Sequence, residues 1–412
     1  MTPAARLQMA IEILEGLGQT AQPADRFLRA WFRSRRFAGS KDRRAIAEQV
    51  FAVQRRRAHL AHRMGGEAPR ALVIASLIEA GDDPTLLFNG GYGPVPLTNA
   101  ERAAIAAAPS PEPDWVRGEY PLWLEEELRR AFDVRLVEEM TAFIGRAPTD
   151  IRVNTLKADR GEVIAALTSE GVACAPTPHA PHGIRISGDA ANLSKAALFE
   201  SGAFEFQDEA AQIAAELCGA RPGMRVLDLA AGAGGKSLAF AASMANQGEI
   251  LACDVRGEAL FELEQRAARA GAAIIKTFVL SEGPLDHGRG LFDAVFVDAP
   301  CSGTGTWRRQ PELRWRLTAE RLSELMALQD RLLDQAAGLV RPGGRLVYAT
   351  CSILGCENQD RVAALQVRQP GFRPLNLAED WPGIMPGLEQ DFRASPASSG
   401  TDGFYCAALR RS

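Results

Sequence analysis

The sequence predicts an α/β fold for its C-terminal part, built on a doubly wound and mostly parallel sheet. From about residue 206 onward, apolar strand-like runs alternate with stretches of helical periodicity. A glycine-rich turn follows the first run, and cysteine-containing segments follow the last two. Open α/β sheets place ligand-binding loops at such strand ends. The predicted strands are 224–229, 249–254, 273–279, 292–298 and 344–350, and the predicted helices lie near 236–245, 256–270 and 318–339.

Residues 1–113 are predicted to form a separate helical domain. Apolar residues recur at three-to-four spacing, as at Leu7, Ile11 and Leu14. Prolines between 109 and 113 indicate a linker at its end. The predicted helical domain also carries a basic stretch. This stretch is either a solvated helix face or a surface that contacts phosphates. The stretch comprises Arg33, Arg35, Arg36, Lys41, Arg43, Arg44, Arg55, Arg56 and Arg57.

Residues 114–205 are predicted to form a small α+β module, which separates the helical domain from the α/β domain at 206–412. The alternating segment 151–157 favours a strand. A helix at 160–170 and two short strands near Cys174 and Ile184 complete the module.

Composition limits the classes of protein to consider. The chain has 412 residues and a net charge of -4, which excludes a uniformly basic protein but leaves room for a local basic patch. Its seven cysteines include no Cys-x-x-Cys pair, which favours reduced thiols over disulfides or a zinc site. No stretch approaches the roughly 20 apolar residues of a membrane helix, and no signal peptide is apparent. We expect a cytoplasmic monomer without a metal or a membrane segment.

The glycine-rich turn after Asp228 predicts a nucleotide-type cofactor, because glycines allow close approach of the backbone and the following helix offers free N–H groups. A phosphate-binding P-loop would need glycine at Ala230, and a dinucleotide fingerprint would need different glycine spacing. S-adenosylmethionine remains as the third candidate. It requires an acid for its ribose at the end of the second strand, and Asp254 stands there.

Two cysteines follow the last two predicted strands, Cys301 after Asp298-Ala299-Pro300 and Cys351 after Thr350. A thiolate is a strong nucleophile. Its addition to carbon 6 of cytosine makes carbon 5 able to accept a methyl group. A second group for release and a carboxyl near the ring would complete this chemistry. The other five cysteines are interpreted as structural, and the second cysteine of a zinc deaminase motif is missing.

These segments together resemble the Sun/nucleolar-protein family of RNA (cytosine-5) methyltransferases, and within it the bacterial small-subunit rRNA methyltransferase B group. The resemblance covers about 115–410, and the N-terminal helices resemble a NusB-like RNA-binding domain. It implies a Rossmann-like S-adenosylmethionine-dependent methyltransferase domain that follows an all-α domain and a small α+β module. The matching segments are 152–157, 207–211, 228–237, 298–305, 308–315, 348–352 and 402–405.

The resemblance also implies a role for individual residues. Cys351 would be the nucleophile, Cys301 would release the product, and Asp298 would touch the cytosine ring or the cofactor. The partner would be RNA, with rRNA as the expected substrate and 5-methylcytosine as the product. S-adenosylmethionine would be held by Ala230, Ala231, Gly232, Ala233, Gly234, Gly235, Lys236, Asp254 and Asp298. RNA would be contacted by Arg152, Asn154, Lys157, Arg308, Arg309 and Arg314, of which the last three are interleaved with Trp307 and Trp315.

Two departures from the family pattern leave alternatives open. Ala230, Gly232, Ala233 and Ser237 replace the family's usual loop residues, and the stretch 278–282 offers no aspartate for the adenine. An RNA-binding assembly factor with a degenerate cofactor loop is therefore one alternative. A DNA cytosine-5 methyltransferase, which would use Cys301 as nucleophile, is another, although the additional Cys351 segment argues against it.

Overall fold

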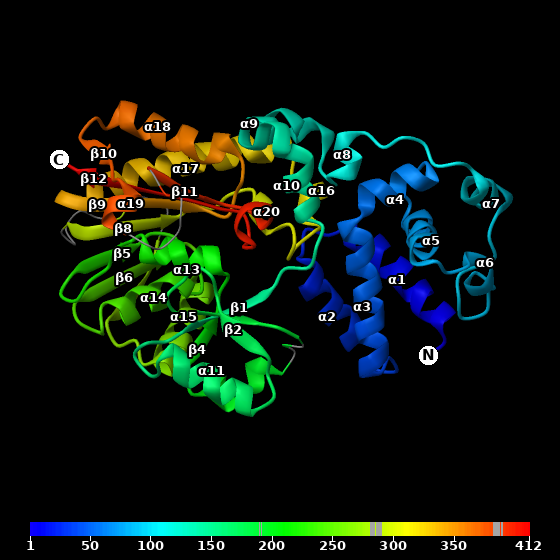
Figure 1. The fold of residues 1–412 in the computed structure, drawn as a ribbon, viewed down its shortest axis with the longest axis horizontal. Coiled ribbons are helices and arrows are strands. Elements are labelled where there is room, and N and C mark those ends of the chain that lie inside the picture. The colour runs from blue at the N-terminus through cyan, green and yellow to red at the C-terminus, as the bar shows by residue number, and fades with distance from the viewer. Residues whose placement is uncertain (189, 191, 281–284, 286–290, 382–387, 389) are drawn as a thin grey trace. The chain divides into compact units, whose positions relative to one another are not determined.

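The computed structural model describes residues 1–412 except 189, 191, 281–284, 286–290, 382–387 and 389 (Figure 1). The chain divides into two compact units. Unit 1 consists of 1–146 together with 306–317, and unit 2 consists of 147–305 together with 318–412. The small α+β module and the α/β sheet thus belong to one unit, and the first unit extends past the predicted linker at 109–113.

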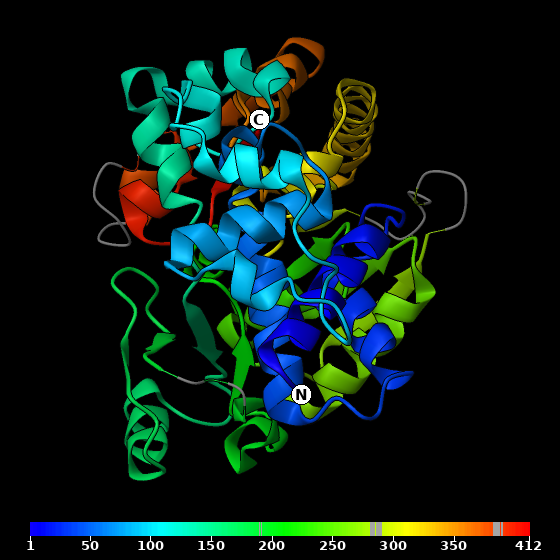
Figure 2. The same cartoon turned by 90° about the vertical axis from the view of Figure 1, so that its right-hand side faces the viewer.

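Unit 1 is helical. Its helices are α1 (Pro3–Leu17), α2 (Ala24–Arg33), α3 (Ser40–Arg55), α4 (Arg57–Met64), α5 (Pro69–Ala80), α6 (Pro84–Leu87), α7 (Asn99–Ala106), α8 (Asp114–Arg117), η1 (Leu122–Leu124), α9 (Glu125–Phe132), η2 (Asp133–Arg135), α10 (Leu136–Ala142) and α16 (Leu313–Arg316). Helices α1, α3 and α5 pack side by side (Figures 1 and 2). Their contact surface is apolar and includes the buried side chains Ile13, Ile46, Val50 and Ile74, so the three-to-four spacing of apolar residues forms one core.

Segment 306–317 joins unit 1 although it lies far along the chain. The carboxylate of Glu312 accepts a hydrogen bond from the backbone N–H of Ala24 at 2.9 Å. The guanidinium of Arg314 donates to the carbonyl of Phe143 at 2.8 Å and lies 5.2 Å from the ring centre of Trp307. Arg314 and Trp307 are both fully buried, so this segment is anchored by polar and aromatic contacts.

Unit 2 begins with a four-stranded antiparallel sheet in the order β2-β3-β1-β4. Its elements are β1 (Thr149–Val153), α11 (Arg160–Ser169), β2 (Cys174–Pro176), β3 (Gly183–Ile186), η3 (Leu193–Lys195), α12 (Ala197–Glu200) and β4 (Phe204–Phe206). Helix α11 packs against this sheet (Figures 1 and 2). The predicted strands and helix between 149 and 186 are present, although residues 114–146 of the predicted module belong to unit 1. The first strand ends at Val153, and the side chain of the next residue, Asn154, donates to the carbonyl of Ala270 at the end of α15.

The large sheet has the order β10-β12-β9-β8-β5-β6-β7, with β11 paired to β12. Its strands are β5 (Arg225–Asp228), β6 (Glu249–Asp254), β7 (Ile275–Val279), β8 (Phe292–Asp298), β9 (Val340–Thr350), β10 (Phe372–Pro374), β11 (Asp391–Ala394) and β12 (Phe404–Arg411). Its helices are α13 (Glu209–Glu216), α14 (Gly235–Ser243), α15 (Gly257–Ala270), η5 (Thr304–Thr306), α17 (Ala319–Leu339), η6 (Gly355–Glu357), α18 (Gln359–Arg368), α19 (Leu377–Asp380) and α20 (Pro396–Ser399). Strands β5 to β9 pair in parallel as predicted, whereas the antiparallel additions β10 to β12 were not predicted.

Two apolar layers hold this sheet between helices. Helices α13, α14 and α15 cover one face, and α17 and α18 cover the other (Figure 1). Strand β6 is buried almost throughout, as expected of a parallel strand covered on both faces. Because β5 lies between β6 and β8, the chain reverses its winding there, and the loops after β5 and β8 diverge to leave a crevice.

Candidate active site

A cleft of about 670 Å³ opens at the carboxyl ends of β5, β6, β8 and β9. All of the residues predicted to hold the cofactor line it except Gly234, and so do Cys301 and Cys351. Additional lining comes from Val255, Arg256 and Leu280. The sequence prediction that the strand ends converge is therefore consistent with the geometry of unit 2.

The glycine-rich loop needs its glycines for two different reasons. Gly232 has φ +54° and donates its N–H to the Asp254 carboxylate at 2.8 Å, which ties the loop to the end of β6. Gly234 has φ +81°, and a Cβ there would lie 1.9 Å from the side chain of Leu263 in α15. Gly234 thus lets α14 and α15 approach each other, whereas Gly232 shapes the cleft.

Asp254 is held as an anion at the end of β6. Burial alone would raise the pKa of Asp254, but hydrogen bonds from Arg256 and from the Gly232 N–H lower it below its ordinary value. Arg256 contributes its backbone N–H at 2.9 Å and two guanidinium nitrogens at 3.0 and 3.1 Å. An ionised carboxylate beside the cleft suits a pair of hydroxyl groups. Arg256 has no signal in the sequence motifs and was not predicted.

The surroundings of Asp228 indicate whether the cleft can hold a cationic ligand. Its side chain is fully buried, and one oxygen accepts a hydrogen bond from Ser237 Oγ at 2.6 Å. The other oxygen has no partner among the residues that the structure describes. Burial, assisted by the charges of Asp298 and Asp254, raises the pKa of Asp228 to about 7. A buried carboxyl oxygen without a partner among the described residues fits the ammonium group of an amino-acid ligand such as S-adenosylmethionine.

Lys236 connects the loop to the other half of the cleft. Its ammonium lies 2.5 Å from the Asp298 carboxylate at the end of β8. Burial alone would lower the pKa of Lys236, but Asp298, Asp228 and Cys351 raise it, so the ammonium keeps its charge. This contact orients Asp298 beside the two thiols.

The two thiols are neighbours. The Sγ atoms of Cys301 and Cys351 lie 3.4 Å apart, within hydrogen-bonding distance for sulfur. The hydrogen bond to Cys351, then burial and the charges of Cys351 and Glu357, raise the pKa of Cys301 well above its ordinary value. Cys301 therefore keeps its proton while Cys351 faces it. Both are partly exposed, whereas Cys218, Cys253, Cys356 and Cys406 are buried and Cys174 is partly exposed.

A buried carboxylate that the sequence did not reveal joins the two cysteine loops, which are the segments that follow β8 and β9 and carry Cys301 and Cys351. Glu357 accepts hydrogen bonds from the backbone N–H and the hydroxyl of Ser302 at 2.8 and 2.5 Å. It also accepts from the Ser352 hydroxyl at 2.5 Å and from Gln329 at 3.0 Å. Ser302 follows Cys301, and Ser352 follows Cys351. One side chain therefore fixes the residues next to both thiols.

The residues of unit 2 that were predicted to contact RNA are buried or hydrogen-bonded to the backbone of the same unit. Arg152 is buried, which lowers its pKa to about 10. The Asn154 amide donates to the carbonyls of Gly202 and Ala270, at 2.9 and 2.8 Å, and Lys157 donates to two further carbonyls of the same turns. Asn154 and Lys157 therefore connect the small sheet to α15. The structure does not test their predicted contact with RNA.

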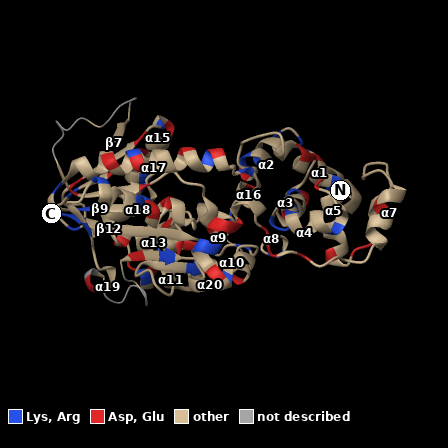
Figure 3. Ribbon diagram, turned by 90° about the horizontal axis from the view of Figure 1, so that it is seen from above, with Lys and Arg blue, Asp and Glu red and all other residues tan. Residues whose placement is uncertain are grey.

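The predicted RNA contacts in unit 1 also differ in exposure. Arg314 is fully buried and Arg308 is buried, while Arg309 is exposed. In the basic stretch, Arg56 pairs with Glu79 at 2.9 Å and Arg57 pairs with Glu67 at 2.7 Å. Figure 3 shows acidic and basic positions mixed over the helices of this unit. The stretch is thus partly a set of ion pairs, and Arg309 is the exposed cation of segment 308–314.

The described residues contain no helix of the length and apolarity required to cross a membrane. They also contain no cluster of three or more His, Cys, Asp or Glu side chains arranged to hold a metal ion.

Comparison with known proteins finds family models for two parts of the chain. The family model "16S rRNA methyltransferase RsmB/F" matches residues 217–410, and a "Methyltr_RsmF/B-like, ferredoxin-like domain" matches 120–191. The ribosomal RNA small subunit methyltransferases B of Pseudomonas putida and Pseudomonas syringae pv. tomato are 31% and 30% identical. Their alignments cover 71% and 76% of this chain and 67% and 70% of the relatives.

Other relatives are longer than the matched part. The chain spans 57% of the length of a probable ribosomal RNA small subunit methyltransferase B of Synechocystis, at 33% identity over 64% of this chain. It spans 66% of the Bacillus subtilis relative, at 29% identity over 71% of this chain.

Solved structures support the same relationship. The crystal structure of PH0851 is 28% identical, with a TM-score of 0.78 over 100% of this chain and 99% of that chain. A methyltransferase homolog protein from Pyrococcus horikoshii is 25% identical, with a TM-score of 0.63 over 73% of this chain and 98% of that chain. The predicted Rossmann-like methyltransferase fold and its cofactor, S-adenosylmethionine, are confirmed at the level of the family. The chain belongs to the 16S rRNA methyltransferase RsmB/F family.

Proposed function

We propose that this chain methylates carbon 5 of a cytosine in RNA, with small-subunit rRNA as the substrate, through a covalent adduct of Cys351. The observation that carries the proposal is the pair of thiols, 3.4 Å apart, at the rim of a cleft suited to S-adenosylmethionine. The names of the family and of its relatives support rRNA as the substrate. Reduced thiols as reaction partners agree with action in the cytoplasm.

The cofactor, when bound, supplies the methyl group. Asp254 would accept hydrogen bonds from its ribose hydroxyls, because this carboxylate is ionised and stands at the end of the second strand of the parallel sheet. Asp228 would pair its free oxygen with the ammonium group of the methionine end. The backbone of 230–235 would lie along the ligand, since its residues are small.

The thiols would act in sequence. Cys351 Sγ forms a bond to carbon 6 of cytosine, and the electron pair of the carbon 5–carbon 6 double bond becomes available at carbon 5, which accepts the methyl group. The base that removes the proton from carbon 5 would then be Cys301. Transfer of this proton re-forms the double bond and expels Cys351 as thiolate, so one proton leaves for each methyl group added.

The coupling between the thiols explains how Cys301 changes its role. Before attack, hydrogen bonding to Cys351 is the largest cause of the raised pKa of Cys301. Once Cys351 becomes a neutral thioether, this cause disappears and Cys301 can lose its proton to water. The resulting thiolate is then a base beside carbon 5.

Asp298 would hold the edge of the cytosine ring. Its contact with Lys236 leaves the carboxylate oriented at the start of the Cys301 loop. The carboxylate would accept a hydrogen bond from the amino group of cytosine, and in its protonated form it would donate to ring nitrogen 3, which gains electron density when Cys351 adds.

Two other functions make different predictions. A DNA-type enzyme would attack through Cys301, and it would leave the neighbouring Cys351, 3.4 Å away, without a role in the attack. An RNA-binding assembly factor without activity would leave the cleft unused. Transfer of tritiated methyl from S-adenosylmethionine to unmodified small-subunit rRNA, followed by bisulfite sequencing, tests the proposal. Label at one or more cytosines supports it. Binding of RNA without label, while calorimetry detects no S-adenosylmethionine binding, would favour the assembly factor.

A further inference from the structure

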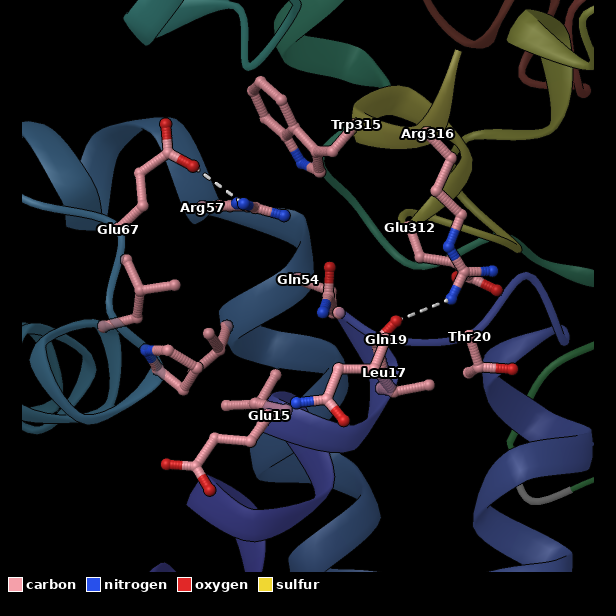
Figure 4. Close-up of a pocket in the computed structure, with 15 residues that line it drawn as sticks. Glu15, Leu17, Gln19, Thr20, Gln54, Arg57, Glu67, Glu312, Trp315 and Arg316 are labelled. Atoms are coloured by element: carbon pink, nitrogen blue, oxygen red, sulfur yellow. Dashed lines mark hydrogen bonds and ion pairs between the residues drawn. The ribbon is translucent and has the colours of Figure 1, made fainter.

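A second pocket of about 510 Å³ lies within unit 1, apart from the cleft described above. It is formed by the end of α1, the junction of α3 and α4, and segment 312–316 (Figure 4). In Figure 4 Gln54 lies between Arg57 on one side and Glu312 on the other, with Trp315 above them. Leu14, Leu17, Val53 and Leu72 give the pocket an apolar lining. The pocket therefore combines polar side chains with an apolar surface.

Two acceptors in this pocket have no hydrogen-bond partner within the part of the chain that the structure describes. Glu312 is 3% exposed, and one of its oxygens accepts the N–H of Ala24 at 2.9 Å, while Oε2 has no partner among the described residues. Gln54 is 8% exposed, and its Oε1 likewise has none. Buried polar atoms in folded proteins almost always have partners. Two orphaned acceptors in one pocket, one of them a carboxylate oxygen, indicate a ligand with N–H donors.

Donors and flat groups stand beside these acceptors. Trp315 Nε1 and Arg57 Nε are buried donors without an acceptor among the described residues. The Arg57 guanidinium lies 5.7 Å from the ring centre of Trp315 and is held at its tip by Glu67 at 2.7 Å. Indole and guanidinium planes are the groups on which proteins stack nucleobases. The pocket is thus suited to a flat heterocycle that both donates and accepts hydrogen bonds.

Guanine is the nucleobase that fits this pattern. Its ring N–H and neighbouring amino group are adjacent donors, which suit a carboxylate and an amide oxygen, and its carbonyl oxygen suits an N–H donor. Adenine and cytosine place a ring acceptor next to their amino group, which would face Glu312 unfavourably. Uracil has no amino group. We propose that this pocket of unit 1 binds a guanine base through Glu312, Gln54 and Trp315.

The base could belong to a nucleotide of the RNA or to a free guanine nucleotide. The first source rests on the proposed function, since it makes the pocket a second reading site for the RNA substrate. Segment 308–315 was expected to contact RNA. In this case it would do so through Glu312 and Trp315, and not through Arg314, which is buried. The second source is independent of methyl transfer.

The test uses the full chain and four probes. Guanosine monophosphate and inosine monophosphate, which lacks only the amino group, are titrated by calorimetry. A uridine oligonucleotide with one guanosine is compared with the same oligonucleotide carrying one inosine. Guanosine monophosphate should bind about tenfold more tightly than inosine monophosphate. Without the amino group, a buried acceptor of the pocket has no hydrogen-bond donor. This comparison needs no variant, so it does not depend on folding.

Variants then locate the site. Glu312→Gln keeps an acceptor for the Ala24 N–H, and it should reduce the preference for guanosine over inosine to about one. Gln54→Met serves as a second variant and should weaken guanosine monophosphate binding. Glu15→Gln removes a charge from an exposed acid of the same pocket and is the matched control, with binding unchanged.

The outcomes separate the two sources and the two proposals. Guanosine preference in the oligonucleotide, lost in Glu312→Gln, assigns the base to RNA. Preference in the mononucleotide alone assigns it to a free nucleotide. Equal binding of guanosine and inosine probes, or a preference unchanged by Glu312→Gln and Gln54→Met, overturns the inference. Methyl transfer is measured separately, so failure of the methylation proposal leaves the mononucleotide result interpretable.

Discussion

The Sγ atom of Cys301 lies 3.4 Å from the Sγ atom of Cys351, although 50 residues separate them in the chain. Parallel pairing of β8 and β9 creates this proximity, because Asp298 pairs with Ala349 at the ends of the two strands. Cys301 lies three residues after the end of β8, and Cys351 directly follows the end of β9. The pairing of β8 and β9 therefore places both thiols side by side, and the pKa of Cys301 depends on Cys351.

Replacing each of the two cysteines should produce a different defect in the reaction. Cys351→Ala should abolish methylation and form no covalent complex, since the attacking atom is absent. Cys301→Ala should still attack and methylate, and then accumulate as a protein–RNA adduct. A denaturing gel with labelled RNA and S-adenosylmethionine distinguishes the two variants.

Cys253→Ala, a change at a buried cysteine outside the cleft, is a matched control that should form no lasting adduct. An adduct with Cys351→Ala and none with Cys301→Ala would reverse the roles and favour attack by Cys301. The absence of an adduct in both variants would contradict covalent catalysis.

The coupling should also be visible without RNA. The pKa of Cys301 is raised chiefly by its hydrogen bond to Cys351. Thiolate is the form that reacts with iodoacetamide, so a raised pKa moves the alkylation of Cys301 to higher pH. In Cys351→Ala the largest cause is absent, and the alkylation midpoint of Cys301 should move to lower pH.

Mass spectrometry of the Cys301 peptide across a pH series measures this shift. Partly exposed Cys174 lies outside the cleft, and the extent of its alkylation serves as the internal reference for both proteins. An unchanged midpoint for Cys301 would show that burial, and not Cys351, controls its titration.

Much of this site could be predicted from the sequence because strand ends leave a local signal. The apolar runs before Asp298 and Cys351 and the glycine turn after Asp228 each specify a short segment, and parallel pairing brings such segments together. The methyltransferase fold and its cofactor could be anticipated from these motifs and are confirmed by the relatives.

The remaining features depend on contacts between distant segments. Glu357 belongs to no motif recognised in the sequence, and its role appears only when Ser302 and Ser352 converge on it. Arg314 carries a charge that favours a surface position, yet the carbonyl of Phe143 and the Trp307 ring hold it in the core of unit 1. The antiparallel strands β10 to β12 are short or poorly alternating, so periodicity did not reveal them.

Asp254 should be required for cofactor affinity. Asp254→Ala removes the carboxylate proposed to bind the ribose, and the loss of a charged hydrogen bond costs about 1.5–3 kcal/mol of binding free energy. Calorimetry with S-adenosylmethionine measures the change. Because Asp254 also accepts the Gly232 N–H, Asp254→Asn is the companion variant that preserves an acceptor for the loop. Unchanged affinity in both variants would remove Asp254 from the ribose site.

Glu357 should control the chemical step and leave cofactor binding intact. Its carboxylate accepts four hydrogen bonds, three of them from the residues that follow the two cysteines. Glu357→Gln keeps the shape but replaces one acceptor oxygen by a donor, so either the Ser302 N–H and the Gln329 amide or the two serine hydroxyls lose their acceptor. Each charged hydrogen bond lost costs about 1.5–3 kcal/mol, and the two loops become free to move apart.

The expected result is a fall in kcat of about tenfold or more, with KM for S-adenosylmethionine within about twofold, because positioning of the thiols acts on the reaction and not on the cofactor. Gln329→Met is the comparison variant, since it removes one of the same hydrogen bonds and the 3.0 Å bond to the Pro300 carbonyl beside Cys301, and so disturbs one cysteine loop and not both. Its kcat should fall less than that of Glu357→Gln at a comparable loss of thermal stability. If both variants lose kcat in proportion to their melting temperatures, Glu357 only stabilises the fold; if KM rises while kcat holds, it serves the cofactor instead of the thiols.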